Sequence, residues 1–480
     1  MSRKKINESS IGIDVTKNVN LLKKYHKSLV FDYTEYPTKS NWPESFDEVD
    51  YSESLINWLR DNPRAESLFY VHTPFCEELC YFCLCSKEIT KDYEKVKNYL
   101  YNYLFKEIDL LKGVFEKAGV KPNFKEIYFG GGSPTFYREE EFSALRDKIA
   151  DFIDFPGIES WTVEIDPRRV EVDRLKFYHE MGVNRLSFGI QDFDPPVQEE
   201  INRIQPPELV SNLLTDEIRD LFPAINFDLL IGLPAQTLGG LKNTIDEVIK
   251  LKPTQLQTMY VHYKPDVRKY MTRMVRNGPM PDFYDRKALF NAASKQLTDS
   301  GYLRAGFESY ALPGDELAQS IEEKKAYYNS LGTQRGAAKN FIAVGSSAHG
   351  VFGNTYVQNY YEQNLYREAL DQNKLPIYRG RKLDQEDMLR RTVINQIRTY
   401  FEIVFTDFDN FLSCDKFKEH FSEEIEMLKE FEKDKLVKIR DDGFELTELG
   451  THFSPQVCEV FDKYANRKPF NLDIPVVVEA

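Results

Sequence analysis

The sequence predicts an α/β protein, a partial (β/α)6 barrel with an N-terminal arm and a helical C-terminal domain. Between about residues 68 and 265, short runs rich in β-branched and aromatic residues alternate with longer segments of helical period. After about residue 380 the pattern becomes helical and ends in a hairpin-like segment. The chain has 480 residues, well beyond the roughly 250–300 at which one hydrophobic core stops growing, so more than one domain is expected.

Residues 1–65 are predicted to form the N-terminal arm. They are polar and mixed in character, and they include the aromatic-rich segment Phe31-Asp-Tyr-Thr-Glu-Tyr-Pro-Thr38. The charged opening residues are not followed by an apolar run, and no run of about eighteen apolar residues occurs anywhere in the chain. We therefore predict a cytoplasmic protein with no membrane span.

Residues 66–375 are predicted to form the barrel domain and its extension. Apolar residues at helical spacing mark two of its helices, one over residues 96–111 and one over residues 241–249. Because ligands of parallel α/β folds bind where strands end, residues at those ends are expected to converge on one site. The six strand candidates are SLFYVHTPF (67–75), EIYFGGGSP (126–134), WTVEIDP (161–167), RLSFGIQDF (185–193), NFDLLIGLP (226–234) and LQTMYVHYKP (256–265).

Residues 376–480 are predicted to form a small helical domain that resembles a winged helix. The evidence is a helical segment followed by LVKIRDDGFELTELG (436–450), in which Asp442-Gly443 supplies a hairpin turn. A winged-helix regulator of DNA is disfavoured, because the formal net charge of −14 provides no cationic surface for a phosphate backbone. No nucleic-acid partner is therefore predicted.

Four of the six cysteines fall within ten residues, at Cys76, Cys80, Cys83 and Cys85. Such clustering is typical of a metal site or a catalytic centre rather than of a disulfide framework. Zinc usually takes four ligands in two separated pairs, and no second pair follows, although Cys85 or a distant histidine could complete a site. Three thiolates on an iron–sulfur cluster leave one iron open, which is what a reagent such as S-adenosylmethionine requires.

The C-x3-C-x2-C spacing resembles the radical S-adenosylmethionine superfamily, and the chain more closely resembles the oxygen-independent coproporphyrinogen III oxidase (coproporphyrinogen dehydrogenase) family. The resemblance also extends weakly to Tyr33–Thr38 and Leu446–Gly450. It is carried by Tyr70-Val-His-Thr-Pro-Phe-Cys76, Gly130-Gly-Gly-Ser-Pro-Thr135, Glu164-Ile-Asp-Pro167, Arg185-Leu-Ser-Phe-Gly-Ile-Gln-Asp-Phe193 and Asp228-Leu-Leu-Ile-Gly-Leu-Pro-Ala-Gln-Thr237.

The resemblance implies a role for each matching residue. Cys76, Cys80 and Cys83 would hold a [4Fe–4S] cluster, around which the aromatic rings of Tyr70 and Phe82 would pack. Tyr70 and Glu164 are the two positions to which we assign a catalytic role. One S-adenosylmethionine at the cluster would bind Gly131, Gly132, Ser133 and Glu164, and a second beside it would bind Gln191, Arg203 and Asp228. A glycine-rich strand end suits such a role, because backbone groups without side chains can approach a ligand closely.

Several residues depart from the family's pattern. The oxidases typically have an arginine where this chain has Asp32, in the arm that closes over the tetrapyrrole. His262 and the segment Phe307-Glu308-Ser309 also differ, and Gly345–Gly350, which contains His349, is more similar to haem-chaperone-like relatives. A buried histidine with satisfied hydrogen bonds is commoner than a catalytic one, so His262 and His349 remain candidates only.

The resemblance implies reductive cleavage of S-adenosylmethionine and hydrogen abstraction from a tetrapyrrole precursor, with oxidative decarboxylation of coproporphyrinogen III to protoporphyrinogen IX in haem biosynthesis as the preferred reaction. It also implies a one-electron donor such as flavodoxin or ferredoxin, and a monomeric enzyme. Two alternatives stay open: transfer of a methyl or methylene unit to another substrate, and haem binding without turnover, as in a haem chaperone.

Overall fold

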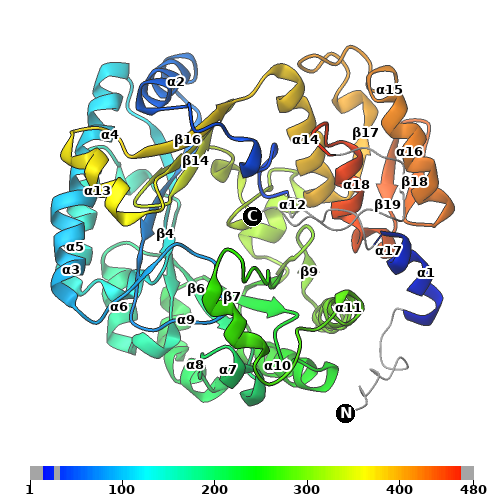
Figure 1. Ribbon diagram of the computed structural model, residues 1–480, viewed down its shortest axis with the longest axis horizontal. Coiled ribbons are helices and arrows are strands. Elements are labelled where there is room, and N and C mark those ends of the chain that lie inside the picture. Colours follow the sequence, from blue (N-terminus) through cyan, green and yellow to red (C-terminus); the bar gives the residue numbers. More distant parts are fainter. Residues whose placement is uncertain (1–14, 26–32, 466–480) are drawn as a thin grey trace.

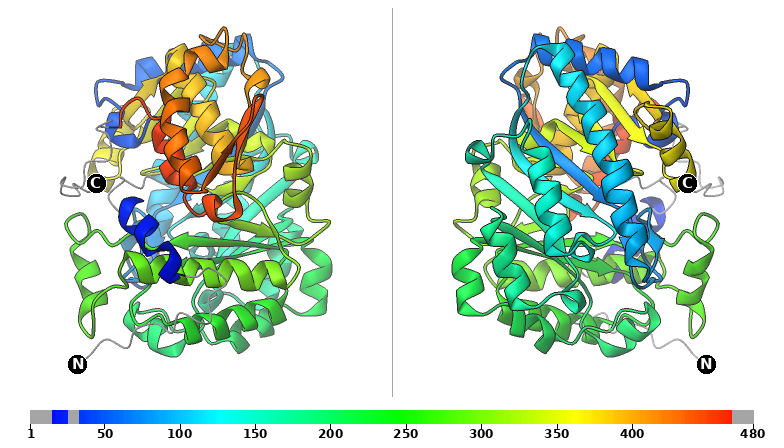
Figure 2. Two further views of the ribbon diagram at one scale, coloured as in Figure 1. Left: turned by 90° about the vertical axis from the view of Figure 1, so that its right-hand side faces the viewer. Right: turned by 90° about the vertical axis from the view of Figure 1, so that its left-hand side faces the viewer.

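The structure of the protein is a computed structural model that describes residues 15–25 and 33–465 (Figure 1). Its main body is a twelve-stranded sheet with helices along its outer face. In the right-hand view of Figure 2, the blue to cyan helices of residues 93–149 lie in front of the strands. Within the described residues, no helix is both long and apolar enough to span a membrane.

All six predicted strands of the barrel are present, and neighbouring strands pair in parallel in the order in which they occur along the chain. The predicted α/β fold, with a parallel barrel-like sheet, is confirmed. Each crossover passes through at least one helix, as parallel pairing requires. The strands are β1 (Glu66–Thr73), β4 (Asn123–Gly131), β5 (Ser160–Ile165), β6 (Arg185–Gln191), β7 (Ala224–Ile231) and β8 (Gln255–Tyr260).

The helices of the barrel bury one apolar face against these strands. The helix predicted over residues 96–111 is continuous in the structure but contains a π-helical segment, Leu100–Leu104, between α3 and α4. The five apolar residues at helical spacing that predict this helix are all buried: Val96, Leu100, Leu104, Ile108 and Leu111. The helices are α3 (Tyr93–Tyr99), α4 (Phe105–Ala118), α5 (Glu139–Ile149), α6 (Val172–Glu180), α7 (Pro195–Glu200), α8 (Pro207–Leu213), α9 (Asp216–Leu221), α10 (Leu238–Leu251) and α11 (Phe283–Asp299).

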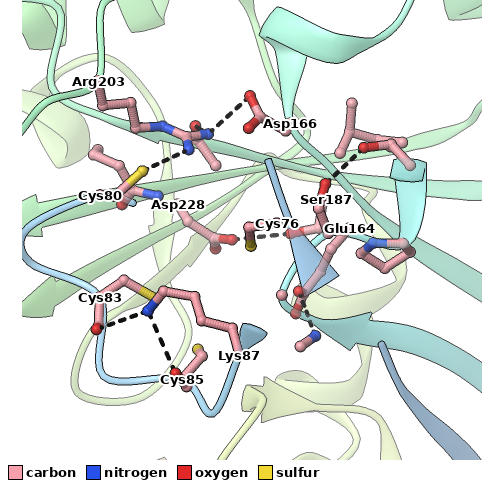
Figure 3. A pocket seen from close by; sticks show the side chains of 18 of the residues that line it. Cys76, Cys80, Cys83, Cys85, Lys87, Glu164, Asp166, Ser187, Arg203 and Asp228 are labelled. Atoms are coloured by element: carbon pink, nitrogen blue, oxygen red, sulfur yellow. Dashed lines mark hydrogen bonds and ion pairs between the residues drawn. The ribbon is translucent and has the colours of Figure 1, made fainter. Parts of the chain in front are cut away.

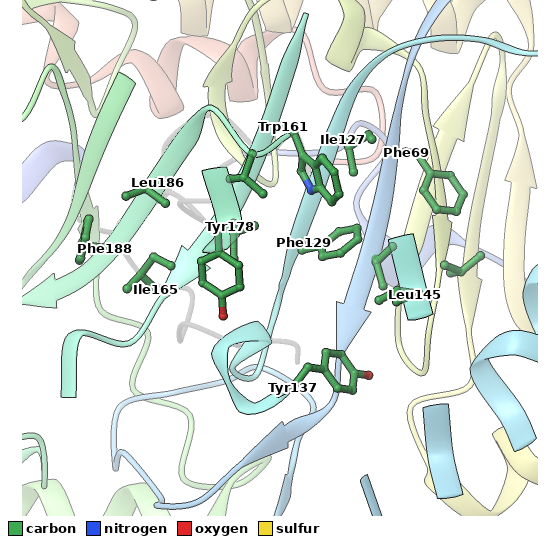
Figure 4. Close-up of a cluster of buried hydrophobic side chains, with 14 of the residues drawn as sticks. Phe69, Ile127, Phe129, Tyr137, Leu145, Trp161, Ile165, Tyr178, Leu186 and Phe188 are labelled. Carbon is green, nitrogen blue, oxygen red and sulfur yellow. The ribbon is translucent and has the colours of Figure 1, made fainter. Parts of the chain in front are cut away.

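The core between strands and helices is rich in aromatic rings (Figure 4). Trp161 on β5 stacks on Phe142 of α5, with ring centroids 5.8 Å apart, and packs edge-on against Phe129 of β4 at 5.3 Å. Each of these side chains is at most 1% exposed. Burial of a large apolar side chain stabilises the fold by about 1.5–3 kcal/mol, so this core fixes the strand ends that carry the site.

The sheet extends beyond the six barrel strands on both sides. Next to β1 lie β13 (Phe341–Val344), which pairs with it in parallel, and then β14 (His349–Phe352), β15 (Thr355–Asn359) and β16 (Ile377–Lys382), which pair antiparallel. Beyond β8 lie β10 (Ser309–Ala311) and β9 (Leu303–Arg304). The domain boundary predicted at residue 375 therefore falls just before the last strand of the main sheet.

The C-terminal region has its own core and contains the predicted hairpin. β18 (Val437–Ile439) and β19 (Gly443–Leu446) pair antiparallel across the Asp442-Gly443 turn, and β17 (Glu402–Val404) adds a third strand. The helices are α14 (Gln385–Tyr400), α15 (Phe417–His420), α16 (Ser422–Lys433), α17 (Glu448–Thr451) and α18 (Ser454–Val460). Helices with a hairpin match the winged-helix-like arrangement that the sequence predicts.

The predicted N-terminal arm divides between the two cores. Helix α1 (Val15–Tyr25) lies against the C-terminal region, where the ring of Tyr25 stacks on Phe431 at 4.9 Å. Helix α2 (Glu48–Asp61) instead buries Leu55 and Leu59 in the core of the main body. Asp32, the arm position that departs from the family's pattern, lies outside the described residues.

The remaining elements are short and connect or flank those above. They are η2 (Lys39–Asn41), β2 (Phe75–Cys76), β3 (Glu88–Ile89), η4 (Pro134–Phe136), η5 (Phe155–Gly157), η6 (Pro167–Arg169), η7 (Lys269–Val275), α12 (Glu316–Glu322), β11 (Tyr327–Asn329), β12 (Gly332–Gln334), η8 (Gly336–Lys339), α13 (Gln363–Asp371) and η9 (Phe405–Asp407).

Candidate functional site

A cavity of about 590 Å³ opens where the barrel strands end. It brings together residues that are far apart in the sequence but follow neighbouring strands, as expected for a parallel α/β fold. The sequence-predicted site residues that line it are Cys76, Cys80, Phe82, Cys83, Gly131, Gly132, Ser133, Glu164, Gln191, Arg203 and Asp228. Tyr70 does not line it; its ring stacks on Tyr128 at 5.9 Å and its hydroxyl lies 3.2 Å from His72 Nδ1.

The loop that carries the cysteines begins directly after β1 and is closed by a short parallel pairing of β2 with β3. Backbone and side-chain bonds fasten its middle to the loop after α7. The N–H of Tyr81 donates to the Ile201 carbonyl at 3.0 Å, and the Asn202 amide donates to the Leu79 carbonyl at 2.9 Å. These bonds hold the loop that carries the four cysteines, whose side chains are drawn in Figure 3.

Two arginines face the thiol of Cys80, the most buried of the clustered cysteines. Arg203 Nη1 lies 3.6 Å and Arg168 Nη2 lies 3.8 Å from its Sγ. Burial raises the pKa of the neighbouring Cys76 thiol to about 12. A thiol with such a raised pKa stays protonated in the absence of a metal. It loses its proton when a metal binds, because the thiolate is the form that acts as a ligand.

These thiols suit a cluster better than a single ion. Within residues 15–25 and 33–465, no group of three histidine, cysteine, aspartate or glutamate side chains is arranged to hold one metal ion. A cubane presents a separate iron to each thiolate, so its ligands stand farther apart than those of a tetrahedral zinc. The donor set, three thiols of one loop that line one cavity beside arginine cations, fits a [4Fe–4S] cluster.

The glycine segment at the end of β4 has no room for side chains. Gly131 has φ +109°, and a Cβ there would lie 2.6 Å from the ring of His72. A Cβ on Gly132 would lie 2.6 Å from the Phe75 carbonyl oxygen. The backbone can therefore approach the cysteine loop closely, and the Ser133 hydroxyl, bonded to Thr135 at 2.8 Å, continues the same wall of the cavity.

Glu164 ends β5 beside this glycine segment. Its carboxylate accepts from the Gly131 N–H at 3.0 Å and from the Tyr128 hydroxyl at 3.1 Å. Burial, followed by the charge of Asp228, raises the pKa of Glu164 to about 8. A cationic ligand against this carboxyl would favour its ionised form.

Asp228 lies in the middle of β7 and lines the cavity, where its charge acts on Glu164. It accepts from the Asn226 amide at 2.8 Å and from the Ser187 hydroxyl at 3.1 Å. The positive charge of Arg203 also acts on Asp228 and opposes the effect of burial on the pKa of this carboxyl. Burial raises the pKa of Asp228 to about 6, so this carboxyl too ionises more readily against a cation.

Arg203 is directed at other groups. It donates to the Gly189 carbonyl at 2.7 Å and lies 3.5 Å from Asp166 Oδ1, in addition to its contact with Cys80. Burial opposes ionisation of Asp166, but Arg203 and Arg168 lower the pKa of Asp166 below its usual range. Asp166 and Arg168 were not singled out from the sequence, although the first lies within the Glu164–Pro167 motif.

The segment PPVQEEINRIQ (195–205), whose sequence suggests a helix that would carry Arg203, forms a shorter helix. α7 ends at Glu200, and Asn202 has φ +55°, so the chain turns before Arg203 and directs it into the cavity. Gln191 also has a positive φ, 68°, at an irregularity in the pairing of β6 with β7. This irregularity directs the end of β6 toward the cavity, as β-bulges often do next to active sites.

The residues that depart from the family's pattern occupy two places. His262 and Glu308 line the cavity. His349 does not line the cavity. Its Nε2 lies 2.9 Å from a carboxylate oxygen of Glu35 in the arm and 2.9 Å from the Ser330 hydroxyl, which agrees with a structural role for this partly buried histidine. The Glu308 carboxylate accepts from the Tyr328 hydroxyl at 3.0 Å.

Comparison with known proteins places the chain in a family. The model of the Radical SAM superfamily matches residues 70–248, and the model of the HemN C-terminal domain matches residues 383–453. The solved structure described as coproporphyrinogen III oxidase (HemN) from Escherichia coli, a radical SAM enzyme, superposes with a TM-score of 0.83 at 29% identity, covering 95% of this chain and 100% of that one. The fold and the cysteine loop thus define a radical S-adenosylmethionine protein.

Two curated relatives specify the family further. The chain is 32% identical over 446 residues to the oxygen-independent coproporphyrinogen III oxidase of Pseudomonas aeruginosa, covering 92% of this chain and 95% of the relative. It is 34% identical over 434 residues to the enzyme of that name from Helicobacter pylori strain 26695, covering 90% and 93%. The chain belongs to the oxygen-independent coproporphyrinogen III oxidase family. Its cofactors are the [4Fe–4S] cluster and S-adenosylmethionine, as the sequence predicted.

Proposed function

We propose that this protein catalyses the oxygen-independent oxidation of coproporphyrinogen III to protoporphyrinogen IX in haem biosynthesis. The observation that carries the proposal is that three thiols, two carboxyls with raised pKa values and a glycine-rich strand end all line one cavity. Relatives of that name cover most of the chain. When bound, the cluster and S-adenosylmethionine supply the one-electron chemistry that removes hydrogen from a propionate side chain.

The protein's own residues would bind and orient the cluster and the S-adenosylmethionine molecules. Cys76, Cys80 and Cys83 would hold the cluster, and Glu164 with the backbone of Gly131 would hold the methionine or ribose groups of one S-adenosylmethionine. A second molecule would be bound by Gln191, Arg203 and Asp228. Phe82 would pack around the cofactors from the cavity wall. Tyr70 would act through Tyr128, on which it stacks and whose hydroxyl donates to Glu164.

The cavity wall also suits an anionic substrate. Lys91 and Arg138 both line it, and no carboxylate partner of either occurs among the described residues. Arg138 immediately precedes the first turn of α5, where a cation is unfavourable to the helix dipole, so helix stability does not explain its place. The guanidinium of Arg138 lies over the Tyr93 ring at 3.9 Å but has no ion pair in the part of the chain that the structure describes. Two such cations in a chain of net charge −14 favour a ligand with several carboxylates, such as a porphyrinogen with four propionates.

The proposal includes a one-electron donor such as a flavodoxin or ferredoxin, and a monomeric enzyme. It also treats residues 1–65, 66–375 and 376–480 as the arm, barrel and C-terminal domain. The described part of the arm supports a covering role, because Thr34 lines the cavity while its neighbour Glu35 contacts His349.

The reaction is tested by anaerobic incubation of the reconstituted protein with coproporphyrinogen III, S-adenosylmethionine and a reductant. Each of two propionates should lose a hydrogen atom, carbon dioxide and one electron, leaving a vinyl group that mass spectrometry detects as protoporphyrin after oxidation. A methylated product would indicate the methyl-transfer alternative instead. Haem binding with no product of either kind would indicate the chaperone alternative.

Loss of the cations is expected to weaken substrate binding without slowing the chemical step. Replacing Lys91 and Arg138 together by glutamine should raise KM for coproporphyrinogen III by about fivefold to thirtyfold, since each exposed charge pair contributes up to about 1 kcal/mol. The control is Lys121→Gln, an exposed lysine before β4 that does not line the cavity. An unchanged KM in the double variant would exclude these cations from substrate binding.

A further inference from the structure

Lys87 follows the clustered cysteines and turns back toward them. Its ammonium group donates to the carbonyl oxygens of Cys83 at 3.1 Å and Cys85 at 3.4 Å, and to the hydroxyl of Tyr270 at 3.3 Å (Figure 3). The Tyr270 hydroxyl also donates to the Cys83 carbonyl. The side chain lines the cavity and is partly buried, so it joins the third cysteine of the motif to η7.

The charge of Lys87 differs from that of the other cations around this loop. Arg168 and Arg203 contact Asp166, and Arg169 lies 2.7 Å from Glu77, so each has a carboxylate within 4 Å. Among the described residues, no carboxylate lies within 4 Å of the Lys87 ammonium, which contacts three oxygens and the side chain of Cys83. Its positive charge is therefore not neutralised by a neighbouring carboxylate, and it lies beside the backbone of a proposed cluster ligand.

An uncompensated cation next to a cluster affects reduction directly. Three thiolates surround the iron centre with negative charge, and the incoming electron adds one more. A nearby positive charge stabilises the reduced form more than the oxidised form, and the partly buried setting weakens screening by solvent. Hydrogen bonding and charge around the ligands are the means by which proteins set cluster potentials.

We propose that the positive charge of Lys87 makes the [4Fe–4S] cluster easier to reduce. The inference rests on the proposed ligation by Cys76, Cys80 and Cys83, but not on the identity of the substrate. A purely structural role predicts loss of iron or of stability, whereas a charge role predicts a changed midpoint potential at full iron content.

The test is a redox titration, followed by electron paramagnetic resonance, of reconstituted variants without S-adenosylmethionine or porphyrinogen. Lys87→Gln keeps a donor for the carbonyl groups but removes the charge, and its reduction equilibrium should become about tenfold less favourable, a fall of 59 mV for a one-electron couple. Lys87→Arg should keep the wild-type potential. The control Lys269→Gln removes an exposed lysine next to Tyr270 and should leave the potential unchanged.

The outcomes separate the two roles. A wild-type potential in Lys87→Gln at full iron content would overturn the proposal. Loss of iron from Lys87→Gln, with full iron in Lys87→Arg, would also overturn it in favour of a role in assembling the loop. Because the potential is read on the cluster alone, a failure to convert coproporphyrinogen III would refute the proposed function and leave this result intact.

Discussion

Replacing Cys80 by alanine is expected to abolish iron binding and the formation of 5′-deoxyadenosine. Each thiolate binds its own iron in a cubane, so removing one of three protein ligands leaves a second iron without one. The substitution also leaves the guanidinium groups of Arg203 and Arg168 without the sulfur that they face at 3.6 and 3.8 Å. Cys76→Ala and Cys83→Ala should have the same effect. Iron content, visible absorption and product formation are measured after anaerobic reconstitution.

The fourth cysteine of the loop provides the matched control. Cys85 lies two residues after Cys83 and is exposed, so Cys85→Ala alters the same loop without removing a proposed ligand. It should retain full iron and the wild-type spectrum. Stoichiometric zinc with no iron in the wild-type protein would contradict the cluster assignment. Loss of iron from Cys85→Ala alone would show that the three proposed ligands are the wrong ones.

The barrel could be predicted from the sequence because its signals are local. Strand runs alternate with amphipathic helices, and runs such as WTVEI and NFDLL each contain a carboxylate, Glu164 or Asp228, that lines the cavity. The face of residues 96–111 is buried as expected, even across a π-helical segment that periodicity alone does not reveal. Convergence of Glu164 and Asp228 on one cavity follows from parallel pairing, since neighbouring strands end at the same edge.

The rest of the sheet could not be predicted, because its pairing is set by contacts between distant segments. β13 has four residues and pairs with β1, about 270 residues earlier in the chain, while β14 to β16 continue antiparallel from it. Likewise, nothing in the sequence around Lys87 shows that its side chain turns back to the Cys83 carbonyl. The partners of Asp228, Asn226 and Ser187, were also missed, although Asn226 lies on the same strand face two residues before it.

Asp228→Ala is expected to lower the number of S-adenosylmethionine molecules bound from two toward one while the cluster spectrum stays intact. Gly131 and Glu164 line the cavity from β4 and β5, whereas Gln191 ends β6, Arg203 follows it and Asp228 lies on β7. Asp228 already accepts two hydrogen bonds from neutral groups, yet burial keeps its pKa at about 6. Ligand hydroxyl groups or a cationic sulfur against it would stabilise the ionised form.

The stoichiometry is measured by equilibrium dialysis with labelled S-adenosylmethionine on the reconstituted protein. Asp228→Asn is the second variant, because it keeps the shape of the side chain if alanine disturbs Asn226 and Ser187. Glu164→Gln is the matched variant for the other molecule: it should weaken binding at the cluster by about 1.5–3 kcal/mol, the contribution of a charged hydrogen bond, and reduce 5′-deoxyadenosine formation. A wild-type value of one, unaltered in either Asp228 variant, would leave Gln191, Arg203 and Asp228 as structural residues and remove the second molecule from the proposed function.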